Sequence, residues 1–123
     1  MTTLHGRRAT ARWERLSVGD LFERITWSSP DKEAIVAWDG AFADPALRRV
    51  TYREADALAN RVANGLLARG LERGDRVVMF CENSVEAYLA KLGVAKAGLT
   101  VVPINPMLAP DVIAYLIDRV EPQ

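Results

Sequence analysis

The stretch LGVAKAGLTVVPINP, residues 92–106, decides how the second half of the chain folds. Its two glycines, Gly93 and Gly98, raise the possibility of a phosphate-binding loop. In such a loop the glycines follow a strand and precede a helix, so that backbone N–H groups point at the phosphate. Here a helical pattern runs up to Gly98 and a strand follows, while Leu99 stands in place of the phosphate-binding lysine. We therefore predict that Gly98 ends a helix with left-handed backbone geometry and that Gly93 marks close helix packing.

Strands and helices alternate outward from this stretch. The apolar pattern predicts helices over residues 17–29, 51–70, 83–98 and 110–120, and strands over residues 34–38, 49–51, 76–81 and 99–104. The first two strands are expected to form a short hairpin near residues 34–51. The last two are continuous apolar runs, which are typical of parallel strands buried on both faces. This order predicts an α/β fold with an incomplete parallel sheet flanked by helices, because two such strands lack the neighbours that would bury them.

Residue pairs at the starts of two helices support these assignments. Ser17 with Asp20, and Thr51 with Glu54, have the spacing of a capping box. In a capping box, the side chain of each residue accepts a hydrogen bond from the backbone N–H of the other. Lys96 lies near the end of the third predicted helix, where the helix dipole stabilises a positive charge.

The charge balance gives no general reason to expect nucleic-acid or membrane partners. Sixteen basic and sixteen acidic side chains cancel. Residues 1–15 are the local exception and are interpreted as a flexible basic arm, with an organelle-targeting peptide as the alternative. Residues 16–123 are expected to form one folded unit. No apolar run reaches the ~18 residues of a membrane span, and the single cysteine fits a cytoplasmic protein.

Few residues are candidates for chemistry. Cys81 and His5 are the only cysteine and histidine, so we expect no metal ligand and no catalytic residue, and Cys81 is interpreted as a small core residue. Glu82 and Asn83 follow a predicted strand at the C-terminal edge of the sheet, where ligands bind in open α/β folds. These two residues are therefore candidates for lining a pocket, with capping of the next helix as the alternative.

Four short motifs, in order along the chain, resemble those of one enzyme superfamily. They are Val50-Thr51-Tyr52-Arg53-Glu54, Gly74-Asp75-Arg76-Val77, Glu82-Asn83-Ser84 with Glu86, and Lys96-Ala97-Gly98 followed by Val102-Pro103-Ile104-Asn105-Pro106. Each motif alone is weak, but their order and spacing resemble the adenylate-forming enzymes, which include acyl-CoA synthetases, luciferases and peptide-synthetase adenylation domains. Asn105, where peptide-synthetase domains more often carry aspartate, favours the acyl-CoA ligase branch.

The resemblance implies a function for a longer parent protein. Such enzymes use ATP and Mg²⁺ to convert a carboxylic acid into an acyl-adenylate, and then transfer the acyl group to coenzyme A. Their phosphate loop, nucleotide-binding motifs and catalytic lysine have no counterpart in this sequence, and Lys96 belongs to a structural motif. The chain is therefore expected to be the N-terminal fragment of an acyl-CoA synthetase-like ligase, without bound cofactors and inactive by itself.

Two alternatives are open at this stage. One is a stand-alone, non-enzymatic assembly or dimerisation module that self-associates through exposed strand edges. The other is a small flavodoxin-like nucleotide binder that uses the loop of residues 81–84. The acyl substrate of a parent ligase cannot be read from this chain, because the family builds its acyl pocket mostly from later residues.

Overall fold

Helices and strands alternate along residues 17–123, which are the residues described by this computed structural model. Their order is α1 (Val18–Ser28), β1 (Glu33–Val36), the short 3-10 helix η3 (Pro45–Arg48), β2 (Arg49–Thr51), α2 (Tyr52–Leu67), β3 (Arg76–Phe80), α3 (Val85–Lys96), β4 (Thr100–Ile104) and α4 (Pro110–Val120). The predicted helices and strands are all found. The basic arm predicted for residues 1–15, with His5, lies outside the described residues.

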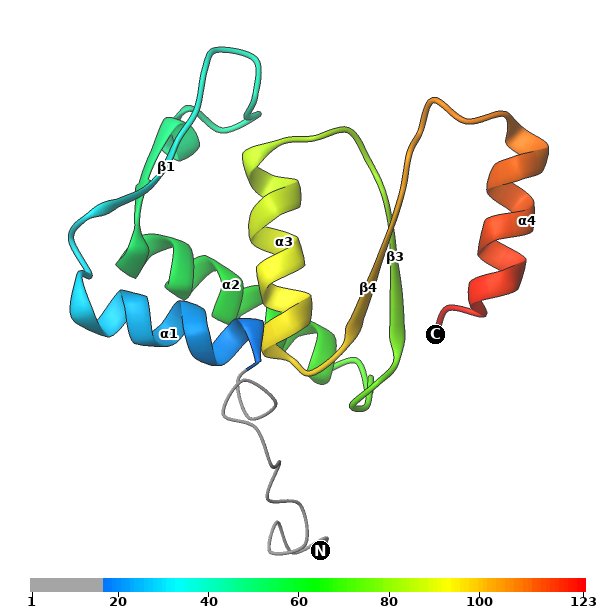
Figure 1. Ribbon diagram of the computed structural model, residues 1–123, viewed down its shortest axis with the longest axis horizontal. Helices are drawn as coiled ribbons and strands as arrows, with labels where there is room; N and C mark the ends of the chain where they lie inside the picture. The colour runs from blue at the N-terminus through cyan, green and yellow to red at the C-terminus, as the bar shows by residue number, and fades with distance from the viewer. Residues whose placement is uncertain (1–16) are drawn as a thin grey trace, which may run out of the picture.

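Helix α3 lies at the centre of the arrangement (Figure 1). On one side of it lie α1, α2 and the hairpin of β1 and β2, in which the strands are antiparallel and Val36 pairs with Arg49. On the other side lie β3, β4 and, farthest away, α4. The α/β fold and the hairpin near residues 34–51 are therefore confirmed. Among residues 17–123, no helix has both the length and the apolar character needed to cross a membrane.

Both predicted capping boxes are present. At the start of α2 the Glu54 N–H donates to the Thr51 hydroxyl at 3.3 Å, and the Thr51 N–H donates to the Glu54 carboxylate at 2.8 Å. The bond from the Thr51 backbone lowers the pKa of Glu54. Ser17 and Asp20 make the equivalent pair at the start of α1, where the bond from the Ser17 hydroxyl lowers the pKa of Asp20.

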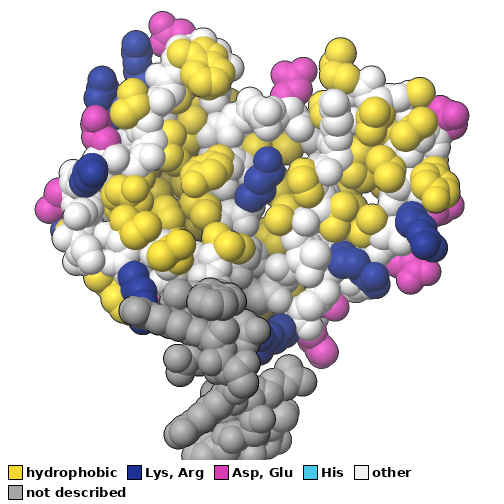
Figure 2. All heavy atoms as spheres, viewed as in Figure 1, with side chains coloured by type: hydrophobic (Ala, Val, Ile, Leu, Met, Phe, Trp, Pro, Cys, Tyr) yellow, Lys and Arg dark blue, Asp and Glu magenta, His cyan; other side chains and the backbone are white. Residues whose placement is uncertain are grey.

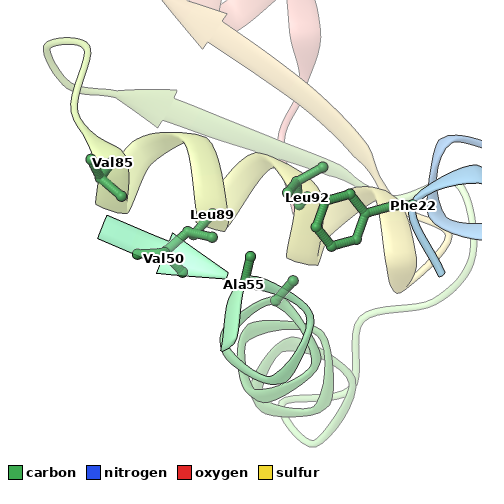
Figure 3. Packing of buried hydrophobic residues seen from close by; sticks show 7 residues of the cluster. Phe22, Val50, Ala55, Val85, Leu89 and Leu92 are labelled. Atoms are coloured by element: carbon green, nitrogen blue, oxygen red, sulfur yellow. The ribbon is translucent and has the colours of Figure 1, made fainter. Parts of the chain in front are cut away.

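The main core lies between α1, β2, α2 and α3. Figure 3 shows its side chains pointing toward one another: Phe22 comes from α1, Val50 from β2, Ala55 from α2, and Leu89 and Leu92 from α3. The buried positions of α2 are alanines, which allow α3 to pack close to the α2 backbone. This cluster holds α3 in place, and α3 in turn supports the β3–β4 sheet.

The two glycines of the opening stretch have the roles predicted for them. A Cβ atom on Gly93 would lie 2.5 Å from the Val62 Cβ and 2.8 Å from the Ala59 carbonyl oxygen, so α3 can approach α2 this closely only at a glycine. Gly98 has a φ of +75°, in the left-handed region, and it follows the last turn of α3. Neither glycine forms a phosphate-binding loop.

Strands β3 and β4 form a parallel sheet that aligns residues 76–80 with residues 100–104. The Thr100 N–H donates to the Asp75 carbonyl at 2.8 Å. Because alternate residues of a parallel strand face its partner, this bond places the backbone of Pro103 on the edge of β4 that faces away from β3. A proline on that edge interrupts no bond between the two strands, which explains how β4 includes it.

The burial of this sheet differs from the prediction. The apolar runs predict strands buried on both faces, but β3 is only partly buried and its Phe80 is 54% exposed. Cys81, predicted to be a core residue, is exposed. No residue of α4 is buried. These exposures share one cause, since no other described strand lies beside β3 or β4. Figure 2 shows the resulting hydrophobic side chains on the surface, on the α4 side of the molecule.

Candidate functional site

The carboxyl ends of β3 and β4 border an open hollow of about 530 Å³. Its lining comes from the end of each strand, from the loop that follows each strand, and from one lysine of α3: Met79, Cys81, Glu82, Asn83, Lys91, Pro103, Ile104, Asn105, Pro106 and Met107. Glu82 and Asn83 are both exposed there, at the sheet edge for which they were predicted. The hollow also includes Lys91 and Asn105, which the sequence did not single out for it. A ligand-binding role for Glu82 and Asn83 stays a prediction.

Capping of α3, the alternative role for Glu82 and Asn83, belongs instead to Ser84. The Ala87 N–H donates to the Ser84 hydroxyl at 3.1 Å, and Ser84 has the extended backbone of an N-cap residue. The loop therefore supplies the helix with its cap from Ser84. The side chains of Glu82 and Asn83 are not needed for that purpose.

A turn shapes the opposite side of the hollow. The Met107 N–H donates to the side-chain oxygen of Asn105 at 2.9 Å, and the Leu108 N–H donates to the Asn105 carbonyl at 3.3 Å. Bonds of this kind hold an Asx-type turn in one conformation. The loop after β4 consequently has a fixed shape beside the loop of residues 81–84.

The hollow offers an ammonium group from Lys91, a carboxylate from Glu82 and amide groups from Asn83 and Asn105. These groups can bind a polar ligand by hydrogen bonds and charge. Among residues 17–123 there is no group of three or more His, Cys, Asp or Glu residues that could hold a metal ion. The side chains that the structure brings together here are thus donors and acceptors suited to a polar ligand.

Glu86 fixes the start of α3 against the loop between β1 and η3. Its carboxylate accepts hydrogen bonds from the Ala43 N–H at 2.7 Å and the Asp44 N–H at 3.2 Å. Bonds from its own N–H and from the Ala43 N–H lower the pKa of Glu86. The ionised carboxylate thus holds the first turn of α3, where the loop of residues 81–84 ends.

A buried ion cluster joins three helices. The ammonium of Lys96, whose side chain is 5% exposed, pairs with Glu23 of α1 at 2.9 Å and with Asp56 of α2. Burial lowers the pKa of Lys96, but the hydrogen bonds from its ammonium to Asp56 and Glu23 outweigh this effect, so the pKa lies above its ordinary value. Lys96 is therefore charged and structural. Its partners have no signal in the sequence, since Asp56 lies 40 residues away from it.

Known proteins match this fold and sequence. A family model for AMP-binding enzymes matches residues 22–123. A medium/long-chain-fatty-acid–CoA/3-oxocholest-4-en-26-oate–CoA ligase of Mycobacterium tuberculosis is 31% identical over 104 residues, which cover 85% of this chain and 18% of that protein. The long-chain-fatty-acid–CoA ligase FadD13 of M. tuberculosis is 35% identical over 96 residues, which cover 77% of this chain and 19% of that protein.

A solved structure gives the same assignment. The N-terminal domain of FACL13 from M. tuberculosis superposes with a TM-score of 0.71 at 33% identity, over 85% of this chain and 25% of that chain. This chain thus spans only 18% and 19% of the length of the two relatives above. The matched residues 22–123 contain all four of the short motifs found in the sequence. The chain therefore belongs to the family of AMP-binding enzymes, in which it corresponds to the N-terminal part of acyl-CoA synthetase-like ligases.

Proposed function

We propose that the whole protein is an AMP-forming acid–thiol ligase whose carboxylic acid substrate is a fatty acid, and that this chain is its N-terminal part. The observation that carries the proposal is the joint match of fold and sequence to the N-terminal domain of FACL13. The two ligases reported above add support, because both are named for fatty acids and coenzyme A.

The proposed reaction has two steps. The substrate carboxylate attacks the α-phosphorus of ATP, so that pyrophosphate leaves and an acyl-adenylate forms. The thiol of coenzyme A then attacks the acyl carbon, and AMP leaves with the electrons of the acyl–oxygen bond. AMP is a far better leaving group than the oxygen of a free carboxylate, which is why the acid must first be activated.

The described residues do not fit the task of holding ATP or Mg²⁺. The hollow contains a single lysine and no glycine-rich loop, and residues 17–123 lack a carboxylate cluster for a metal. We therefore assign nucleotide and metal binding to the part of the ligase that this chain does not span. The 123-residue chain alone is accordingly proposed to be inactive.

Within the ligase, the chain is proposed to supply scaffold and one wall of a ligand site. Glu82, Asn83, Lys91 and Asn105 meet at the carboxyl edge of a parallel sheet, where α/β folds bind ligands. A cytoplasmic location is proposed because Cys81, the only cysteine, has no disulfide partner within the chain.

A chimera tests the proposal. This chain replaces the matching segment of FadD13, to which it is 35% identical. The chimera is expected to release pyrophosphate in a reaction that requires ATP and a fatty acid, whereas the 123-residue chain alone releases none. A matched chimera carrying Gly93→Val, which places a side chain against Val62, should lose both folding and activity. A chimera that has the circular dichroism spectrum of FadD13 but no such activity would contradict the proposal.

A non-enzymatic assembly module is the second candidate. The observation in its favour is the exposed apolar surface of α4, which includes Val112 and Tyr115. Sedimentation analysis of the pure chain over a wide concentration range distinguishes the two candidates, because a module that functions by self-association should form a stable oligomer of defined size. The family match leaves the flavodoxin-like alternative without support.

A further inference from the structure

A second hollow, of about 180 Å³, lies between the β1–β2 hairpin and the start of α3. Figure 1 shows these two parts side by side. Hydrogen bonds join them, since the Val85 N–H donates to the Ala41 carbonyl at 2.9 Å and Glu86 accepts from N–H groups of the same loop. The two walls of this hollow are therefore held in a fixed relative position.

The walls of the second hollow are mostly apolar and open to water. Val36 and Trp38 are each more than half exposed, and Tyr88 is half exposed. An apolar ligand that covers these side chains removes their surface from water, which favours binding. Ligand sites are commonly of this kind, with apolar walls and a few polar groups that fix the orientation of the ligand.

The second hollow adjoins the hollow at the carboxyl ends of β3 and β4. Asn83 lines both of them. Tyr88 of one hollow and Lys91 of the other are three residues apart on α3, a spacing that brings side-chain Cβ atoms within about 5–6 Å of each other. A continuous surface thus leads from Trp38 past Tyr88 to the ammonium group of Lys91.

This surface fits a ligand that has an apolar tail and a negative head. The second hollow has room for about six groups of the size of a water molecule or a methylene, at roughly 30 Å³ each. Lys91 has no ion pair with another described residue, so its ammonium is free to bind a carboxylate. Asn83 and Asn105 offer amide N–H donors to the same head, whereas Glu82 opposes it by its like charge.

We propose that the two hollows together form a binding site for a fatty acid, with its carboxylate at Lys91 and its chain between Val36, Trp38 and Tyr88. The site lies wholly on this chain and is separate from the acyl pocket, which the family resemblance assigns mostly to later residues. Its role rests on the proposed function: in a fatty-acid ligase, a site of this kind holds the substrate before it reaches the reacting centre.

Binding of octanoate to the 123-residue chain, followed by the NMR chemical shifts of backbone amides, tests the site without ATP or coenzyme A. Val36, Tyr88 and Lys91 report on the site, and Gly65 of α2, which lines neither hollow, is the reference. Octanoate is expected to bind at least about tenfold more tightly than butyrate, because it buries up to four more methylene groups. 1-Octanol, which has the same tail and no charge, should bind about fivefold more weakly than octanoate.

Substitutions separate the head of the ligand from its tail. Lys91→Met should weaken octanoate binding by about fivefold, as expected for the loss of one partly buried ion pair. Glu82→Gln should strengthen it, because the opposing charge is removed. Trp38→Ser should weaken the binding of octanoate and leave that of butyrate unchanged. The matched control is Trp27→Ser, at an equally exposed tryptophan of α1 outside both hollows, which should change neither.

Each outcome decides the proposal. The absence of shifts at Val36, Tyr88 and Lys91, or equal affinities for octanoate and butyrate, overturns it. Equal affinities for octanoate and 1-octanol, with no effect of Lys91→Met, indicate an apolar pocket without a carboxylate site and overturn the assigned ligand. Octanoate binding that depends on both Lys91 and Trp38 supports the proposal. The ligase proposal is judged separately, by the activity of the chimera.

Discussion

Replacing Lys96 with methionine removes the cation that α1, α2 and α3 share while keeping most of the side-chain stem. The side chain of Lys96 is 5% exposed, that of Asp56 18% and that of Glu23 36%. Removing one partner of a fully buried pair costs about 3–5 kcal/mol. Because water reaches part of both carboxylates, we expect the lower end, a loss of about 3 kcal/mol. That loss is a large share of the roughly 5–15 kcal/mol by which a domain is stable.

Urea unfolding followed by far-ultraviolet circular dichroism measures this loss. The matched control is Lys91→Met on the same helix, where the lysine is partly buried and has no ion pair with a described residue. The control should change the free energy of unfolding by about 0.5 kcal/mol or less. Adding Asp56→Asn to Lys96→Met should restore part of the loss, since it neutralises the carboxylate left without a cation. Equal free energies of unfolding for Lys96→Met and Lys91→Met would refute the reasoning.

The same cluster predicts an alkaline pH dependence. A lysine whose pKa is raised by folding stabilises the fold fully below its unfolded pKa of about 10.4, and this contribution is lost as the pH rises through the higher folded pKa. The unmodified chain should therefore lose more stability over this range than Lys96→Met does. If the free energy of unfolding falls equally with pH in the two chains, the Lys96 ion pairs contribute nothing to stability.

Three further predictions follow from packing and from the carboxylates. Gly93→Ala should destabilise the fold by about 1–3 kcal/mol, because its Cβ would overlap Val62, and thermal unfolding should show a lower midpoint. Gly65→Ala, in α2 where no atom of another element lies within 4 Å of a new Cβ, should stabilise the fold by about 0.5–1 kcal/mol, and a loss of stability would contradict the open space there. Glu54 and Glu86 have lowered pKa values in the folded chain. Their contribution to the stability of the fold is therefore present above an unfolded pKa of about 4.3 and is lost as the pH falls through the folded pKa values. As the pH is lowered, the free energy of unfolding should accordingly fall less for Glu54→Gln than for the unmodified chain. Identical curves of stability against pH would contradict the capping box.

The order of the elements could be predicted because its signals are local. A capping box such as Thr51 with Glu54 acts across one helical turn, and a glycine such as Gly98 ends a helix through its own backbone angle. Burial could not be predicted in the same way. Phe80 and Cys81 are exposed because the described residues place no further strand beside β3. The apolar sequence of one strand does not indicate which other strands lie beside it.

The candidate site was predicted only in part for a similar reason. Glu82 and Asn83 directly follow a strand, so their place at the sheet edge can be read from one segment. Lys91 and Asn105 come from other elements and join the hollow only when α3, β3 and β4 pack together. The partners of Lys96 lie on two other helices, and no spacing within a single helix indicates them.

The most direct test of the central claim is the intact mass of the cellular protein that carries this sequence. If the chain is part of a ligase like the relatives of which it spans 18% and 19%, that mass should be several times the 13.6 kDa of the chain. A cellular protein of 13.6 kDa would contradict the ligase account and favour the assembly module.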